Sequence, residues 1–142
     1  YFTGAGFTPQ CTAGIMGNLQ QESGIDPTRY QSGGGPGRGM CQWTVGSDRF
    51  KNLEAHAKSK GKDWKDLQSQ CEFLDMELQG KDATTLKLLK KYVGGYEQFK
   101  AITDVKKACK VFEDSFERAG IPAMEKRYHR YVYWSDCSSQ AI

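Results

Sequence analysis

The sequence predicts an all-α domain with at most a small β-hairpin, and three observations support this fold class. Apolar side chains recur every three or four residues over most of the chain, which is the spacing of a buried helix face. Cap signals separate these stretches, because a Ser, Thr or Asp precedes most of them and a glycine follows most of them. A single glycine-rich loop, residues 32–39, interrupts the helical pattern and is expected to form one wall of a cleft.

Length and composition restrict the function classes. The 142 residues predict one compact domain, residues 1–142, with 38% hydrophobic and 26% charged residues. No apolar run has the length of a membrane span, and a dispersed net charge of +3 does not indicate nucleic-acid binding. Because the chain begins with Tyr1 and shows no signal peptide, we expect a domain excised from a longer protein.

The first two helices have clear start signals. The first is expected after Thr8, an N-cap followed by Pro9 at the first helical position, and ends before Gly24. We expect residues 1–7, which are rich in glycine, to form a loose entry segment. The second helix is expected after Ser47, with a closing glycine. Its inner face is predicted to consist of Phe50, Leu53 and Ala57.

Further helices follow. A third is expected after Asp63, and its apolar stripe is the most regular in the chain: Trp64, Leu67, Cys71, Leu74 and Leu78. A fourth is expected after Asp82, followed by a short piece at residues 96–102 and a longer helix after Thr103. The buried positions of that longer helix are predicted to be Val105, Cys109, Phe112 and Phe116. A final helix is expected near Pro122, with an inner stripe of Met124, Tyr128, Tyr131 and Val132.

The five cysteines do not indicate a metal or catalytic site. They have no C-x-x-C spacing, and His56 and His129 are the only histidines, so we expect no metal ion and no other cofactor. Cys71 and Cys109 fall on apolar helical stripes and are interpreted as core thiols rather than as a bridge. A Cys–His nucleophile built on Cys41 is the alternative, which no local sequence feature supports.

One carboxylate stands out because it lies on an apolar helix face. Glu22 falls on the same side of the first helix as Ile15 and Leu19, in the last turn before Gly24. Burial and the negative end of the helix dipole both favour the protonated carboxyl group. A carboxyl group that keeps its proton near neutral pH suits general acid catalysis. The alternative is a Glu22 side chain that turns toward water at a frayed helix end.

The residues after Glu22 favour the catalytic interpretation. The helix ends in E-S-G, the glycine-rich loop follows, and the chain then reads G-M-C-Q-W up to Trp43. This combination resembles the lysozyme-like superfamily of peptidoglycan glycosidases, and the longer string GIMGNLQQESGIDP…GRGMCQWT resembles its phage-tail lysozyme branch. The resemblance is strong over residues 13–49. It continues weakly through QCEFLDMEL (residues 70–78) and FERAG (residues 116–120).

The resemblance implies cleavage of the bond between N-acetylmuramic acid and N-acetylglucosamine in peptidoglycan, with Glu22 as general acid. Around it, Tyr30 and Trp43 offer flat faces for sugar stacking, and Trp43 has the alternative of plugging the core. The amide of Gln42 suits sugar hydroxyls or the N-acetyl group, or it ties the loop to the helix. Met40 is expected to pack beneath the site.

The second catalytic group stays open between Asp26 and Asp48. Asp26 follows the acid by one turn and Asp48 follows the Gln–Trp pair, but Asp–Pro turns and helix starts use such residues too. Glu117 is interpreted as structural because it lies off the apolar stripe. Two available aspartates favour a hydrolase over the alternative, a lytic transglycosylase that leaves 1,6-anhydro ends. A non-catalytic glycan-binding or structural domain of a phage tail or secretion apparatus is the third hypothesis.

The expected partner is the peptidoglycan glycan strand, and the expected location is the cell wall or the virion. Wall-binding or peptidase domains are expected elsewhere in the longer protein.

Overall fold

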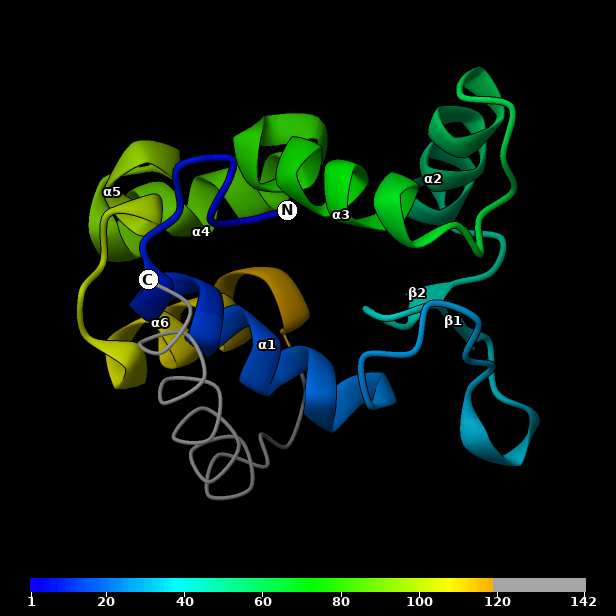
Figure 1. Ribbon diagram of the computed structural model, residues 1–142, viewed down its shortest axis with the longest axis horizontal. Helices are drawn as coiled ribbons and strands as arrows, with labels where there is room; N and C mark the ends of the chain where they lie inside the picture. Colours follow the sequence, from blue (N-terminus) through cyan, green and yellow to red (C-terminus); the bar gives the residue numbers. More distant parts are fainter. Residues whose placement is uncertain (119–142) are drawn as a thin grey trace.

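The computed structural model describes residues 1–118, which form six α-helices and one short antiparallel hairpin (Figure 1). The predicted all-α class with a small hairpin is confirmed. The elements are α1 (Pro9–Ser23), η1 (Ser32–Gly34), β1 (Gly37–Arg38), β2 (Trp43–Thr44), α2 (Asp48–Ser59), α3 (Leu67–Met76), η2 (Glu77–Lys81), α4 (Ala83–Val93), α5 (Tyr96–Lys100), α6 (Val105–Phe112) and η3 (Glu113–Glu117). The helix predicted near Pro122 lies outside the described residues.

The helix α1 lies against α6, and both lie below α3 in the view of Figure 1. Thr8 caps the N-terminus of α1 as predicted, and Gly24 ends it in the left-handed conformation, with φ of 68°. At the contact with α6, a Cβ on Gly14 would lie 2.7 Å from the backbone nitrogen of Cys109. Asn18 donates from Nδ2 to the carbonyl oxygen of Cys109 at 3.0 Å. The absence of a side chain at Gly14 therefore sets how closely the two helices approach.

One hydrophobic core connects the helices. The rings of Phe99, Phe112 and Phe116 stack in series, with centroid separations of 6.3 Å and 4.8 Å. The largest fully buried side chains also include Ile15, Leu19, Met40, Leu53, Phe73, Leu74, Leu78 and Leu89. The aromatic stack runs from α5 through α6 into η3, so the end of η3 is fixed by the core.

The first seven residues are not loose, and that prediction was wrong. Phe2 and Phe7 are each 3% exposed, and their rings meet edge to face at 5.3 Å. The hydroxyl groups of Tyr1 and Tyr96 both donate to the buried Asp75, at 2.8 Å and 2.5 Å. Burying each phenylalanine contributes about 1.5–3 kcal/mol, which outweighs the flexibility that the neighbouring glycines suggested.

The predicted caps of two helices are displaced, whereas Ser47 and Asp82 cap α2 and α4 as expected. The helix α3 begins after Asp66 rather than Asp63, and α6 begins after Asp104 rather than Thr103. The predicted stripe of α3 is consequently rotated. Its described buried side comprises Ser69, Gln70, Phe73, Leu74 and Asp75, while Leu67 is 50% exposed and Trp64 precedes the helix.

Candidate active site

The end of α1 is tied to the segment that follows the glycine-rich loop. Ser23 donates from Oγ to the carbonyl oxygen of Met40 at 2.8 Å, and this bond is buried. This bond gives a physical reason for the combination of the E-S-G and G-M-C-Q-W motifs. The serine next to Glu22 holds the backbone of the second motif in place.

A buried glutamine fixes the same segment from the other side. Gln70 accepts from the backbone N–H of Met40 at 2.9 Å and donates to the carbonyl oxygens of Pro27 and Trp64 at 2.8 Å and 2.6 Å. A Cβ on Gly39 would lie 2.9 Å from Gln70 Oε1, and Gly39 has φ of 75°, so only glycine fits there. Gln70 is a supporting residue that no sequence pattern predicted, although it begins the QCEFLDMEL string.

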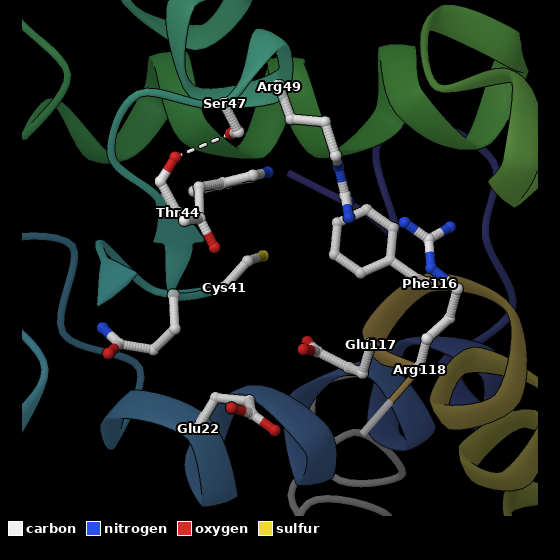
Figure 2. Close-up of a pocket in the computed structure, with 10 residues that line it drawn as sticks. Glu22, Cys41, Thr44, Ser47, Arg49, Phe116, Glu117 and Arg118 are labelled. Carbon is white, nitrogen blue, oxygen red and sulfur yellow. Dashed lines mark hydrogen bonds between the residues drawn. The ribbon is translucent and has the colours of Figure 1, made fainter. Parts of the chain in front are cut away.

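A pocket of about 380 Å³ opens beside Glu22, and we call it the Glu22 pocket. Its walls come from the end of α1, the segment that leads into β2, the start of α2, and η3 with the residue after it. The lining residues are Glu22, Cys41, Gln42, Trp43, Thr44, Ser47, Arg49, Phe116, Glu117 and Arg118. Figure 2 shows the carboxylates of Glu22 and Glu117 and the sulfur of Cys41 pointing into this space from three different segments.

A buried carboxylate behind the pocket holds two of its lining residues. Glu77, which is 1% exposed, accepts from Trp43 Nε1 at 2.7 Å and from Arg49 Nε and Nη2 at 2.7 Å and 3.0 Å. The Arg49 guanidinium also lies over the Phe116 ring, 4.7 Å from its centroid. Arg49 therefore links the start of α2 to η3 across the pocket, and Figure 2 shows the two side chains together.

A second acidic residue holds Arg118. Asp82 accepts from Arg118 Nη1 at 3.0 Å, and Arg49 Nε lies 3.9 Å from the same carboxylate oxygen. Burial raises the pKa of Asp82, but hydrogen bonds from Thr85 and Arg118 and the charge of Arg49 outweigh it and lower the pKa overall. The carboxylate is therefore ionised at neutral pH and anchors both arginines.

Three of the seven predicted site residues line the Glu22 pocket: Glu22, Gln42 and Trp43. Gln42 donates from Nε2 to the carbonyl oxygen of Gly39 at 2.9 Å, a bond within the loop segment rather than to the helix. The indole of Trp43 is 3% exposed and meets Phe73 edge to face, as a core plug would. Contact of Gln42 or Trp43 with a sugar stays a prediction.

The other four predicted residues do not line the pocket. Asp26 is exposed and accepts from the backbone N–H and the hydroxyl of Thr28, both at 2.8 Å, and these bonds lower its pKa. Asp48 is exposed in the first turn of α2. Tyr30 is 54% exposed with the Arg38 guanidinium over its ring at 4.3 Å. Met40 is buried in the core.

The described cysteines are free thiols, so the prediction that Cys71 and Cys109 do not form a bridge is confirmed. Burial raises the pKa of Cys41 well above its usual value, and the charges of Glu117 and Glu77 raise it further. A thiol in that state is a poor nucleophile at neutral pH, which disfavours the Cys–His alternative.

Sequence reasoning missed four lining residues near the arginine end of the pocket: Arg49, Phe116, Glu117 and Arg118. The FERAG string was the signal that could have found the last three, since it was already recognised as part of the resemblance. Helical periodicity pointed away from Glu117, which lies off the apolar stripe of Phe112 and Phe116.

Within residues 1–118, no group of three or more His, Cys, Asp or Glu side chains is arranged to bind a metal ion. None of the described helices has the length and hydrophobicity needed to cross a membrane. In a comparison with protein families, the family model described as phage tail lysozyme matches residues 1–134.

Proposed function

The chain belongs to the phage tail lysozyme family, and from this premise we propose that it is a muramidase with Glu22 as its general acid. Family membership supports a lysozyme-like, peptidoglycan-lytic function and an action at the cell wall, free or carried by a virion. The proposal adds the bond that is cut, which joins N-acetylmuramic acid to N-acetylglucosamine, and the residue that gives the proton.

The position of Glu22 is the observation that carries this proposal. Glu22 is half-buried at the end of α1 and opens into the pocket, while its neighbour Ser23 is bonded to the loop wall. The carboxyl group is therefore held on a rigid element beside a space that polar groups line, including Thr44 and Ser47. Such placement suits proton transfer to a glycosidic oxygen of a bound glycan.

In the proposed reaction, Glu22 gives its proton to the glycosidic oxygen as the bond between that oxygen and the anomeric carbon breaks. The sugar ring then passes through an oxocarbenium-like transition state, and water adds to the anomeric carbon. In the alternative, a lytic transglycosylase, the muramyl hydroxyl attacks instead and gives a 1,6-anhydro end. Asp26 and Asp48 stay predictions for the second group, although neither of them lines the pocket.

The test compares Glu22→Gln with Glu54→Gln, a control at an exposed position on α2. Glutamine keeps the shape of the side chain but cannot donate an acidic proton, so wall clearance should fall by more than about a hundredfold. The control should clear wall suspensions like the wild type. Mass spectrometry of the released muropeptides should find reducing N-acetylmuramic acid ends.

Two results would contradict the proposal. A folded Glu22→Gln variant that keeps more than about a tenth of wild-type clearance would remove Glu22 from the acid role. Chiefly 1,6-anhydro ends in the digest of the wild-type protein would replace the hydrolase with the transglycosylase.

A further inference from the structure

We propose that Glu117 is the second catalytic carboxylate of the Glu22 pocket, where it deprotonates the water that attacks the anomeric carbon. This inference rests on the proposed muramidase function and replaces the structural role that the sequence analysis gave to Glu117.

The described lining of the pocket contains two carboxylates, Glu22 and Glu117. Two further acidic residues lie nearby but do not line the pocket. Glu77 is buried behind the pocket in its bonds to Trp43 and Arg49, and Asp82 binds Arg118. Glu117 is thus better placed than Asp26 or Asp48 to face a sugar that Glu22 protonates.

Both neighbours of Glu117 in the sequence are anchored. Phe116 is 1% exposed and stacks on Phe112 at 4.8 Å. Arg118 has a left-handed φ of 53°, and its backbone N–H donates to the carbonyl oxygen of Glu113 at 2.7 Å. Its guanidinium holds Asp82 in addition. The backbone of Glu117 is therefore fixed from both sides, as a catalytic carboxylate requires.

The Glu117 side chain reaches into the same pocket that Glu22 lines from α1. Figure 2 shows its carboxylate in the space between Glu22 and Cys41. One carboxylate comes from α1 and the other from η3, so a sugar bound in the pocket would meet both.

The reaction balances with these two groups. Glu117 takes a proton from water while the water oxygen bonds to the anomeric carbon, and the bond from that carbon to the glycosidic oxygen breaks. The leaving oxygen takes the proton of Glu22. Glu117 ends protonated and Glu22 ionised, and solvent exchange restores both. This arrangement inverts the configuration at the anomeric carbon, because water enters opposite the leaving group.

The experiment compares Glu117→Gln and Glu117→Ala with the control Asp114→Asn. Asp114 lies in the same turn but pairs with Lys110 at 2.7 Å and does not line the pocket. Both Glu117 variants should lose more than about a hundredfold in turnover, and the control should stay within about twofold of the wild type. Thermal unfolding of each variant verifies that the fold is intact.

Azide separates a catalytic base from a structural residue. Azide is an anion that can attack the anomeric carbon in place of water without being deprotonated. It should therefore raise the activity of the Glu117→Ala variant about tenfold or more. The product should be the glycosyl azide of inverted, α configuration. If the alanine variant does not fold, the Glu117→Gln variant still tests the loss of turnover, because glutamine has nearly the same volume as glutamate.

The outcomes for the two carboxylates are distinguishable. If Glu22→Gln is inactive and wild-type digests carry reducing ends, the proposed function stands whatever Glu117 does. In that case, a Glu117→Gln variant with more than about a tenth of wild-type turnover would overturn the base assignment. A folded alanine variant that azide does not rescue, or that gives the retained azide, would overturn it as well.

Discussion

Glu77 shows how much a single buried carboxylate contributes to the site without lining it. Its two oxygens accept from Trp43 and from both Nε and Nη2 of Arg49, so one side chain orients an aromatic and a cationic wall residue. Burying this charge is tolerated because three donors replace the water that it loses. Removing the charge leaves the Arg49 guanidinium without its main partner.

We predict that Glu77→Gln destabilises the protein by about 2–4 kcal/mol, since breaking a buried pair is costly and Arg49 keeps some access to water. The measurement is the free energy of unfolding from urea titrations, with the exposed substitution Glu54→Gln as control. A loss below about 0.5 kcal/mol, the range of surface substitutions, would show that the network does not stabilise the fold.

At the scale of the elements, the contact of α1 with α6 sets the distance between the two proposed catalytic carboxylates. Glu22 lies in the last turn of α1, and Glu117 ends the η3 turn that continues α6. The two helices touch through the bare backbone of Gly14, where a Cβ would lie 2.8 Å from the Cβ of Ala108. Any side chain at this position must push α6 and η3 away from α1.

We predict that Gly14→Ala is destabilising by roughly 1–2 kcal/mol net, because overpacking against backbone outweighs the better helix propensity of alanine. Activity should fall as well, since the two carboxylates separate. The control is Gly4→Ala, where the new Cβ would meet its nearest neighbour at an ordinary 3.4 Å. The measurements are thermal unfolding and wall clearance of both variants. A Gly14→Ala variant with the stability and activity of the wild type would contradict the predicted clash with α6.

At the scale of the whole molecule, Asp82 joins three parts of the structure. It caps α4 by accepting from Thr85, it binds Arg118 after η3, and it lies 3.9 Å from Arg49 of α2. Its pKa in the folded protein lies below the ordinary value of 3.8 for this group. The folded state therefore binds the proton of this group less readily than the unfolded state, so the ion pairs stabilise the protein above that value.

This stabilisation should be lost as the pH falls from about 5 through the folded pKa of Asp82, because protonation removes the charge that both arginines contact. We predict that Asp82→Asn, which keeps a capping side chain, unfolds more easily at pH 6 and loses less stability on acidification than the wild type. The free energy of unfolding between pH 6 and 3 measures this. Asp104→Asn at the cap of α6 is the control, and an acid slope of Asp82→Asn equal to that of the wild type would refute the prediction.

The helices that the sequence predicted correctly are those whose ends depend on contacts between residues close in the chain. Thr8, Ser47 and Asp82 cap α1, α2 and α4 as expected, because a cap is a contact between residues two or three positions apart. The same locality made Glu22 and the loop motif recognisable. Where several acidic residues competed for one helix start, as Asp63 and Asp66 do before α3, the sequence had no means to choose.

Tertiary structure alone decided what surrounds Glu22. Gln70 and Glu77 support the loop wall from α3 and η2, and Glu117 enters the pocket from a segment almost one hundred residues away from Glu22. Helical periodicity gave Gln70 no role and indicated a structural role for Glu117. A periodic pattern reports only which residues share a face of one helix, so it does not show which helices meet. The packing of α6 against α1 brings Glu117 to the pocket, and the burial of Phe2 and Phe7 orders a segment that its glycines marked as loose. Contacts between distant segments depend on the packing of whole elements, which no local pattern encodes.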